Sequence, residues 1–558
     1  MAKTDMNFSI KELVMGIYDS KFWQKWYEEG IPKSFDYLKV PLKDQFLKWV
    51  EKHPDKIMIY SGDRELSYST VNDTAVRLAK VLLDLGVKKG DRVALGLPNI
   101  PEFIIACHAC MKIGAILVPM NPLYTVPELT FFFTDSGAET VITVSPVAEK
   151  FRAIKEGGES SLDNILVIQV PGKEVVTGVQ AGFIDLNEAI WGVMPEIPDR
   201  AASVEEIVSL QYTGGTTGVP KGCCLSNANF ITVSTCYLKW ASSLISSEHY
   251  KCLCTVPLYH IYGINTTFNF ATYTGGSIVL IPEVTPDNII AAINRYEPTF
   301  WPTVPTLLHL LTLHPELKAS RVRSIQCILS GSAPLPEETM RTFEEISGAK
   351  ILEGYGGSET TNGITTNPVN RQKVRSVGVP FPDIACRVVD LEKGTDDMPI
   401  GEPGELIFKG PLITEKYWNN PEETAIAIRD GWLYTGDIGY MDEDGYIFIV
   451  DRKKDMIICS GFNVYPRDID EVLFAHPKIL EGSAIGIPDA KRGETIKVFV
   501  VTKPGETLNE DEVIEWCRQS LAPYKVPTQV EFIDQLPRTN VNKIDRKELR
   551  KRELGGAL

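Results

Sequence analysis

Tyr212-Thr213-Gly214-Gly215-Thr216-Thr217-Gly218-Val219-Pro220-Lys221-Gly222 is the stretch around which the rest of the chain can be interpreted. Glycines permit backbone angles with positive φ and let amide groups approach an anion closely. Threonine hydroxyls donate hydrogen bonds or ligate a hard cation, and Lys221 adds a positive charge. The pattern predicts a loop that holds phosphate groups. It is not the Walker pattern, because Pro220 precedes the lysine and Gly222 follows it. For the loop taken alone, a Gly/Thr-rich turn without a ligand is the alternative.

Composition bounds the class of protein. The chain has 558 residues, of which 44% are hydrophobic and 23% are charged, as in ordinary globular proteins. More than one domain is expected, because single cores rarely grow beyond ~250–300 residues. The 57 Lys and Arg residues against 73 Asp and Glu residues give a net charge of −16. Such a charge argues against nucleic-acid binding, which needs a basic face, so an anionic nucleotide would have to be held by local positive groups.

The cysteines and the N-terminus indicate a cytoplasmic location. None of the close cysteine pairs has a second matching pair or a downstream histidine pair, so we expect buried reduced thiols and no zinc site. No continuous apolar core follows the first residues, so no signal peptide is expected. The most apolar run, 104–120, contains a histidine and a lysine and is too short and too polar to span a membrane.

Helix-like and strand-like patterns alternate along most of the chain. Apolar residues from Val71 to Leu85 recur with helical spacing, and Gly86 ends the pattern. The alternation predicts βαβ units with largely parallel sheets. After Gly404 the pattern changes to short strands with turns. Buried-strand patterns lie at 93–97, 140–144, 277–281 and 327–329, and a compact α+β pattern follows 468.

Four further motifs follow the loop in order. They are Glu353-Gly354-Tyr355-Gly356-Gly357-Ser358-Glu359, Tyr434-Thr435-Gly436-Asp437, Asp451-Arg452-Lys453-Lys454-Asp455 and Pro537-Arg538-Thr539-Asn540-Val541-Asn542-Lys543. The five blocks, in this order and spacing, resemble the adenylate-forming superfamily of acyl-CoA synthetases, luciferases and peptide-synthetase adenylation domains. The aromatic cluster at 22–27 resembles more specifically the bacterial medium- and long-chain fatty acyl-CoA synthetases.

The resemblance implies an α/β fold in two parts. A large N-terminal domain would contain mostly parallel sheets with flanking helices and a small β-barrel-like subdomain. A small, mobile α+β domain would follow it. The expected bounds are 1–450 for the adenylation domain with a lead-in arm at 1–40, 451–455 for the hinge, and 456–558 for the C-terminal domain.

The resemblance also implies a reaction in two halves. A carboxylate would attack the α-phosphorus of ATP, giving an acyl-adenylate and pyrophosphate, and the thiolate of coenzyme A would then expel AMP. Thr213 and Glu359 match the Mg²⁺-associated positions and supply hard oxygen donors. Lys543 matches the lysine that stabilises the attacking carboxylate. His260 matches a position beside the acyl-adenylate, where it would position the carboxylate.

The same resemblance distributes the nucleotide over several motifs. Asp437 would accept hydrogen bonds from the ribose hydroxyls, because an ionised carboxylate is a pure acceptor, and Arg452 would support the ribose or a phosphate. The phosphates would be held by Thr213, Gly214, Gly215, Thr216, Thr217, Gly218 and Lys221. The adenine slot would be formed by Gly331, Ser332, Ala333, Pro334, Glu353, Gly354, Tyr355, Gly356 and Ser358.

The remaining implied positions concern coenzyme A and the acyl group. Lys454 matches the hinge pivot, while Ser460 and Gly461 match the tunnel for the pantetheine arm. The walls of the acyl pocket are expected to be mostly apolar and to lack an acid for an α-ammonium group, which predicts an apolar monocarboxylate. The bulky rings of Trp301, Tyr237 and Tyr262 would shorten the pocket, which favours medium-chain, carbocyclic or aromatic acids over very long chains. The pocket residues are expected to be Tyr237, His260, Gly263 and Trp301.

Several alternatives stay open. One is a long-chain fatty acid–CoA ligase, another a stand-alone adenylating enzyme that loads an acyl carrier protein, and a third a luciferase-like oxidation. A catalytically inactive nucleotide-binding scaffold is disfavoured, because the charged motif residues are present together. Gly214 and Asn542 depart from the usual family pattern. The expected partners are a small carboxylate, ATP, Mg²⁺ and coenzyme A, with no nucleic acid and no transmembrane segment; peripheral membrane contact is left open, as is the choice between monomer and homodimer.

Overall fold

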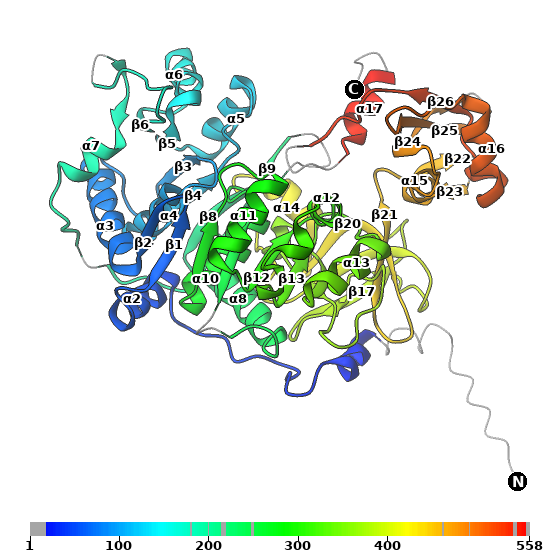
Figure 1. Cartoon of the computed structure of the whole chain (residues 1–558), viewed down its shortest axis with the longest axis horizontal. Coiled ribbons are helices and arrows are strands. Elements are labelled where there is room, and N and C mark those ends of the chain that lie inside the picture. The colour runs from blue at the N-terminus through cyan, green and yellow to red at the C-terminus, as the bar shows by residue number, and fades with distance from the viewer. Residues whose placement is uncertain are drawn as a thin grey trace, which may run out of the picture. The chain divides into compact units, whose positions relative to one another are not determined.

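The computed structural model describes residues 18–178, 181–198, 200–213, 219–246, 250–459, 462–489, 491–539 and 544–553. The chain divides into two compact units. The larger unit comprises Trp23–Ala385 and Lys409–Leu433, and the smaller unit comprises Met1–Phe22, Cys386–Phe408 and Tyr434–Leu558. Helices flank the sheets of the larger unit, and the orange-to-red C-terminal elements form a sheet with helices of its own (Figure 1).

A seven-stranded sheet carries the first half of the larger unit. Its order is β7-β6-β5-β3-β4-β8-β9, and every pair is parallel except β8–β9. The predicted helix with apolar spacing is present as α3, and the predicted strands at 93–97 and 140–144 are β3 and β5. The strands are β3 Arg92–Gly96, β4 Ile116–Pro119, β5 Thr140–Val144, β6 Asn164–Ile168, β7 Ile184–Asp185, β8 Ile207–Thr213 and β9 Lys221–Ser226. The helices of this half are α3 Tyr68–Asp84, α4 Pro101–Ile113, α5 Val126–Ser136, α6 Ala148–Gly157, α7 Leu186–Trp191 and the 3-10 turn η2 Ser145–Val147.

The outer edge of β9 is covered by a distant segment of the chain. The amide of Cys224 donates to the carbonyl of Lys416 at 3.1 Å, and the amide of Trp418 donates to the carbonyl of Gly222 at 2.7 Å. The hydroxyl of Thr414 donates to the carbonyl of Cys224 at 2.8 Å. Because an uncovered edge strand offers unpaired backbone groups, these contacts complete the sheet at this edge.

A nine-stranded sheet, ordered β16-β15-β14-β13-β12-β10-β11-β1-β2, forms the second half. The central pairs are parallel, whereas β1–β2, β14–β15 and β15–β16 are antiparallel. The sheets are therefore largely parallel, as predicted. The strands are β1 Ile57–Ser61, β2 Arg64–Ser67, β10 Lys251–Cys254, β11 Ser277–Leu280, β12 Phe300–Thr303, β13 Cys327–Ser330, β14 Lys350–Tyr355, β15 Thr365–Thr366 and β16 Val379–Pro380. The helices are α2 Leu42–Lys52, α8 Asn227–Trp240, α11 Pro286–Tyr296, α12 Pro305–Thr312, α13 Glu337–Ser347 and the 3-10 turns η6 Leu317–Ala319, η7 Val322–Ser324 and η8 Ser358–Thr360.

One helical run of the larger unit is buried on all sides. It consists of α9 Ile261–Gly263, the π-helix η5 Ile264–Asn269 and α10 Phe270–Thr274. Its two asparagine side chains donate hydrogen bonds to backbone carbonyls, as buried amide groups usually do. The side-chain amide of Asn265 donates to the carbonyl of Thr361 at 3.1 Å, and that of Asn269 donates to the carbonyl of Phe230 at 2.7 Å.

The predicted lead-in arm is packed where the structure describes it. The 3-10 turn η1 Phe22–Trp26 contains Trp23, which is fully buried. The ring of Tyr27 meets that of Trp240 edge-on at 5.1 Å, and its hydroxyl donates to the carbonyl of Pro380 at 2.7 Å. The aromatic cluster therefore anchors this segment to the larger unit.

Short strands follow residue 385, and those from Gly404 onward lie where the sequence pattern predicted them. They are β17 Ala385–Val389, β18 Gly404–Lys409, β19 Ile428–Arg429, β20 Trp432–Met441 and β21 Ile447–Arg452, with helix α14 Pro421–Ala427 before β19. The sheet order is β17-β18-β20-β19, and β21 pairs with β20.

The C-terminal residues of the smaller unit form an α+β fold, in which helices pack on a five-stranded sheet. Alternate residues face opposite sides of a strand, so the sheet has two apolar faces. Helices α15 and α16 cover one face through residues such as Leu473 and Cys517, and Leu549 of α17 packs on the other beside Phe499. The elements are β22 Ile457–Cys459, β23 Phe462–Val464, β24 Ile479–Asp489, β25 Gly493–Thr502, β26 Gln529–Phe532, α15 Pro466–Phe474, α16 Glu510–Ser520, η9 Pro523–Lys525 and α17 Arg546–Glu553.

Two general expectations can be compared with this architecture. All eleven cysteines are buried and unpaired, as predicted. Among the described residues, no helix combines the length and apolar character that crossing a membrane requires.

Candidate active site

The two ends of the Gly/Thr-rich loop are fixed by the β8–β9 pair. Thr213 and Lys221 lie directly opposite each other in the antiparallel register. One residue further in, Tyr212 lies opposite Gly222, and a β-carbon on that glycine would lie 3.1 Å from the tyrosine ring. The hydroxyl of Tyr212 donates to Asp135 at 2.5 Å. Gly214, Gly215, Thr216, Thr217 and Gly218 lie outside the described residues.

Lys221 and Glu359 are brought together through a third side chain, Tyr417. The ammonium of Lys221 forms an ion pair with Glu423 and lies 5.3 Å from the centroid of the Tyr417 ring. The hydroxyl of Tyr417 donates to Oε1 of Glu359 at 2.9 Å. Burial, and next the neighbouring carboxylate of Glu359, raise the pKa of Tyr417, so its hydroxyl keeps the proton that it donates. Lys221, which is predicted to contact phosphate, and Glu359, which is predicted to ligate magnesium, thus belong to one cluster.

The backbone around Glu359 is tightly constrained. Glu359 lies in η8, and its carbonyl accepts from the amide of Thr414 at 2.8 Å. Thr361 and Asn362 follow with positive φ values of 55° and 96°, which residues other than glycine rarely adopt. A β-carbon on Gly356 would lie 1.7 Å from the carbonyl oxygen of Asn362, so only glycine fits there. This motif is therefore shaped as a turn that presents the Glu359 carboxylate.

The two segments predicted to hold adenine meet at the carboxyl ends of β13 and β14. The carboxylate of Glu353 accepts from the amide of Leu335 at 3.2 Å, which ties the end of Gly331-Ser332-Ala333-Pro334 to β14. A β-carbon on Gly331 would lie 3.7 Å from the carbonyl of Gly354, and Ser332 has a φ of 71°. Carboxyl ends of parallel strands are the usual ligand-binding edge of such sheets. Tyr355 is half-buried and Ser358 is buried at this edge.

His260 begins helix α9 as its N-cap residue. Its Nδ1 accepts from the amide of Tyr262 at 3.2 Å. The preceding segment is held by Asn99, whose side chain accepts from the amide of Leu258 at 2.8 Å. A β-carbon on Gly263 would lie only 2.0 Å from the carbonyl of Pro257, so this glycine permits close backbone packing. The structure thus supports a positioning role for Gly263 in the backbone around His260.

The aromatic residues predicted to wall the acyl pocket are held by hydrogen bonds. The hydroxyl of Tyr237 accepts from the side chain of Asn362 at 2.7 Å. The hydroxyl of Tyr262 donates to the carbonyl of Leu329 at 2.6 Å. Trp301 is fully buried in the core cluster that also contains Phe343, and its indole donates to Thr255 at 2.9 Å. This core position gives the predicted pocket role of Trp301 no separate support.

Within the smaller unit, the two predicted ribose contacts are paired across adjacent strands. Asp437 on β20 lies opposite Arg452 on β21, and Nε of the arginine lies 3.2 Å from Oδ1 of the aspartate. Glu405 supports this corner: its carboxylate accepts from the amide of Gly436 at 3.1 Å and pairs with Lys453 at 3.0 Å. The Asp437 carboxylate is thereby presented at a well-ordered strand junction.

The predicted hinge is held on both sides of Lys454. The carboxylate of Asp451 accepts from the amides of Arg452 at 2.7 Å and Arg467 at 2.9 Å. Asp455 pairs with Arg550 of α17 at 2.8 Å. Lys454 itself is exposed. The hinge segment is thus fixed at Asp451 and Asp455 to helices of the smaller unit.

Helix α17 is fixed by a second, partly buried ion pair. Its first residue, Arg546, pairs with Asp470 of α15. Burial raises the pKa of Asp470 to about 6, although Arg546 and the amide of Ala484 act in the opposite direction. The catalytic candidate Lys543 precedes this helix and lies outside the described residues, as do Ser460 and Gly461. Arg538 and Ile544, which lie on either side of Lys543 in the sequence, pair in an antiparallel bridge.

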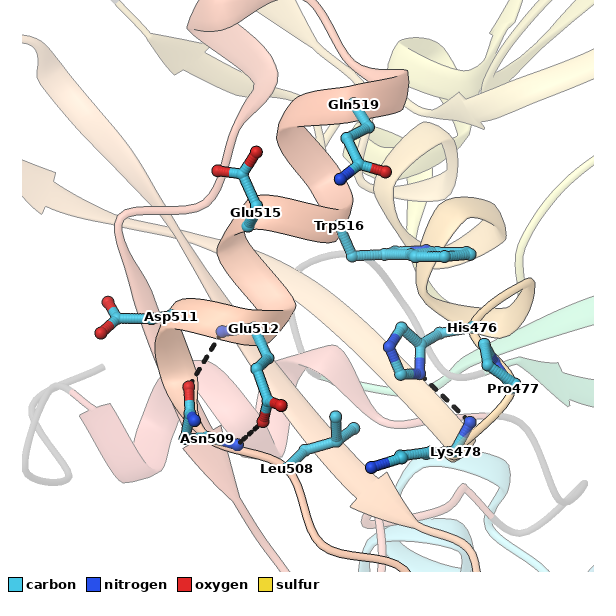
Figure 2. Close-up of a pocket in the computed structure, with 10 residues that line it drawn as sticks. All are labelled: His476, Pro477, Lys478, Leu508, Asn509, Asp511, Glu512, Glu515, Trp516 and Gln519. Atoms are coloured by element: carbon cyan, nitrogen blue, oxygen red, sulfur yellow. Dashed lines mark hydrogen bonds between the residues drawn. The ribbon is translucent and has the colours of Figure 1, made fainter.

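A shallow surface hollow of the smaller unit lies away from these motifs. It is lined by one side of α16 as far as Gln519, by Leu508 and Asn509 before that helix, and by the segment after α15 (Figure 2). The rings of His476 and Trp516 meet edge-on at 4.7 Å, and the Trp516 indole donates to the carbonyl of Val472. Burial, and next Lys478, lower the pKa of His476. None of the predicted site residues that the structure describes lines this hollow.

Three residues that contact predicted site residues or their neighbours escaped the sequence-based prediction: Tyr417 and Glu423 in the larger unit, and Glu405 in the smaller unit. The segment Tyr417-Trp418-Asn419-Asn420-Pro421-Glu422-Glu423 contains a helix-start signal, since Asn420 is an N-cap and Pro421 occupies the first helical position. That signal predicts α14 but not which distant residues its side chains meet.

Comparisons with known proteins agree with this fold. Residues 46–418 match the family model described as AMP-binding enzyme, and residues 468–543 match the AMP-binding enzyme C-terminal domain. A long-chain-fatty-acid–CoA ligase of Bacillus subtilis is 37% identical over 553 residues, covering 96% of this chain and 98% of the relative. A feruloyl-CoA synthase of an Amycolatopsis species is 33% identical over 505 residues, covering 89% and 96%. The structure of O-succinylbenzoate coenzyme A synthetase from Bacillus subtilis, in complex with ATP and magnesium ion, has a TM-score of 0.79 and 27% identity, covering 92% and 100%.

The chain therefore belongs to the AMP-binding enzyme family, and the similarity extends over nearly its whole length. Within that family it is an AMP-forming acyl-CoA synthetase, an acid–thiol ligase. The predicted superfamily, fold class and enzyme class are confirmed.

Proposed function

We propose that this enzyme activates an apolar monocarboxylate with ATP and Mg²⁺ and transfers the acyl group to coenzyme A. The contacts of Tyr417 with both Glu359 and Lys221 carry this proposal. They bring together a carboxylate that can ligate a cation and an ammonium that can bind a phosphate. The first half-reaction needs both kinds of group at one place, since negative charge must be neutralised while the carboxylate attacks phosphorus.

A magnesium ion fits the residues on the phosphate side. A carboxylate and a hydroxyl are ligands that hard cations accept, and Glu359 and Thr213 offer them. Oε1 of Glu359 is engaged by Tyr417, while Oε2 faces Gly357, where a β-carbon would lie only 3.3 Å away. A bound magnesium ion would neutralise phosphate charge there. Lys221 would contact the β- and γ-phosphates together with the loop 214–218.

The other nucleotide contacts come from rigid strand ends. Asp437 would accept the ribose hydroxyls, with Arg452 beside it, and the adenine would lie along Gly354, Tyr355 and Gly331. His260 would position the substrate carboxylate, because its Nδ1 already accepts from the amide of Tyr262 and fixes the ring. Lys543 would stabilise the attacking carboxylate.

Domain rotation about the hinge would connect the two halves. We propose an adenylation domain at 1–450, a hinge at 451–455 with Lys454 as the pivot, and a mobile domain at 456–558 whose Ser460-Gly461 segment contacts pantetheine. The compact units have other bounds, because residues 386–408 and 434–450 group with the C-terminal elements. Asp451 and Asp455 both contact helices that follow the hinge, so a rotation at the residues between them would have to break one of these contacts.

For the acyl group, we propose a medium-sized aliphatic, carbocyclic or aromatic acid. Tyr237 and Tyr262 support the limit on size, because hydrogen bonds hold both rings in place. The Bacillus subtilis relative favours a second candidate, a long-chain fatty acid, and the Amycolatopsis relative is named for an aromatic acid. We also propose a cytoplasmic location; peripheral membrane contact and the choice between monomer and homodimer are matters for measurement.

One experiment tests both the reaction and the substrate class. Carboxylate-dependent ATP–pyrophosphate exchange, with and without coenzyme A, separates a coenzyme A ligase from an enzyme that loads a carrier protein. The ratio kcat/KM is then compared across acetate, hexanoate, benzoate, cyclohexane carboxylate, palmitate and an amino acid. Preference for acetate or the amino acid contradicts an apolar pocket. Preference for palmitate contradicts only the proposed size and selects the second candidate.

A further inference from the structure

The ammonium of Lys221 has an ionic partner within the protein, the carboxylate of Glu423. Its contact with Glu423 is largely shielded from water, since the lysine side chain is 9% exposed and the glutamate 25%. The Tyr417 ring lies beneath the same ammonium, with its centroid at 5.3 Å. A largely buried cation without a counter-ion would be costly, so the carboxylate stabilises the lysine where it stands.

The position of Glu423 is fixed by its own helix. It lies in the first turn of α14, where a negative charge interacts favourably with the helix dipole. Its amide donates to the side chain of Asn420 at 3.1 Å. The adjacent Thr424 hydroxyl accepts from the amide of Tyr417 at 3.0 Å, which ties the backbone of Tyr417 to the first turn of α14.

This arrangement conflicts with simultaneous phosphate binding. Lys221 starts β9 opposite Thr213, at the base of the loop proposed to hold the β- and γ-phosphates. A phosphate oxygen at the ammonium would lie close to the carboxylate of Glu423, and two like charges at that distance repel. The ammonium can serve one anion fully only by leaving the other.

We propose that Glu423 is a positioning residue that acts through Lys221. It is the counter-ion of the ammonium in the nucleotide-free enzyme, and it is displaced by the β- and γ-phosphates of ATP or by pyrophosphate. The inference rests on the proposed function. It adds that the carboxylate of Glu423 competes with the phosphates for the ammonium of Lys221. The ring of Tyr417 remains as a second partner of the cation during the exchange.

Calorimetric binding to the full-length enzyme tests the exchange with Mg·ATP, Mg·pyrophosphate and AMP as ligands. Glu423→Gln keeps the shape of the side chain and removes its charge. We expect it to tighten Kd for ATP and pyrophosphate on the order of five-fold, the equivalent of about 1 kcal/mol for a partly shielded ion pair. AMP, which lacks the displacing phosphates, should bind as before.

Two controls isolate the ion pair. Glu422→Gln removes the same charge from the same helix turn at an exposed position and should leave all three Kd values within two-fold. In a Lys221→Met background, adding Glu423→Gln should give no tightening, because the partner is gone. Unchanged or weaker ATP binding by Glu423→Gln, or a gain that persists without Lys221, overturns the inference.

A measurement on the unaltered enzyme covers the case in which Glu423→Gln does not fold. A crystal structure with Mg·pyrophosphate should show the ammonium of Lys221 on a phosphate oxygen and out of contact with Glu423. An intact Lys221–Glu423 pair beside bound pyrophosphate overturns the inference while leaving the proposed function in place. Failure of the unaltered enzyme to bind either ATP or pyrophosphate instead rejects the proposed function, and the inference with it.

Discussion

Replacing Tyr417 by phenylalanine removes one hydroxyl group that contacts the proposed magnesium ligand. The lost bond is 2.9 Å long and ends on Oε1 of Glu359. A hydrogen bond to a charged group contributes about 1.5–3 kcal/mol. At about 1.4 kcal/mol per factor of ten, this corresponds to a change of roughly 10- to 100-fold, which is also the usual cost of losing a group that orients a metal ligand. We therefore expect the Mg²⁺ concentration for half-maximal activity to rise at least ten-fold.

The assay is pyrophosphate release at saturating ATP and carboxylate over a series of free Mg²⁺ concentrations. Because Tyr417→Phe keeps the ring beneath Lys221, the KM for ATP at saturating Mg²⁺ should change less than the Mg²⁺ dependence. A fall in kcat with an unaltered Mg²⁺ dependence would refute the reasoning.

Tyr37→Phe supplies a matched control. The hydroxyl of Tyr37 also donates to a carboxylate at 2.9 Å, that of Asp383, but this pair is not part of the proposed nucleotide site. Both variants should lose a comparable amount of stability in thermal denaturation. Only Tyr417→Phe should alter the Mg²⁺ dependence, and the same shift in both variants would mean that the effect is a general loss of stability.

The remaining predictions concern three lysines. Lys543→Ala should strongly reduce acyl-adenylate formation and affect the conversion of preformed acyl-adenylate to thioester much less, because the cation is needed in the first half only; normal pyrophosphate release would contradict this. Lys454→Pro should damage thioester formation more than adenylation, because proline stiffens a pivot, whereas an equal loss in both half-reactions would contradict the hinge. Burial, and next Lys43, lower the pKa of Lys112 to about 8, against about 10.4 in the unfolded chain. The unfolded chain then binds the proton more tightly between these values, so the free energy of unfolding should rise with pH across that interval, by up to roughly 3 kcal/mol. Urea denaturation at pH 7 and pH 9.5 measures this rise in the free energy of unfolding. Lys112→Met should abolish it, and an equal rise in the variant would exclude Lys112 as its source.

Local patterns in the sequence predicted the elements well. Apolar residues with helical spacing predicted α3, and its bounds Tyr68–Asp84 agree with the pattern that Gly86 ends. Helix α8 begins directly after Ser226, a residue type that favours the N-cap position which it occupies here. These elements follow from contacts between residues a few positions apart, which spacing records. The strand β9 before that helix was not predicted, because its pairing with β8 depends on the intervening loop.

The contacts that build the site were beyond sequence spacing. Lys221 and Glu423 are 202 positions apart, and Tyr417 and Glu359 are 58 apart. Such contacts depend on how the sheets pack, which no local pattern records. The resemblance to the family supplied candidate roles for Lys221 and Glu359 but not the side chain that joins them. Trp301 illustrates the converse problem, since an aromatic residue in a buried strand can face either side and here belongs to the core cluster.

The covered edge of β9 has a consequence for folding during synthesis. Thr414 and Cys224, which help to close that edge, are 190 positions apart. At ~5–20 residues per second, a ribosome needs roughly 10–40 s to make the chain between them. We expect the β8–β9 hairpin to emerge with one row of amides and carbonyls open, at a stage when other nascent chains could pair with it. The enzyme's yield in cells should therefore depend on chaperones that shield this strand until the segment 414–418 has been translated.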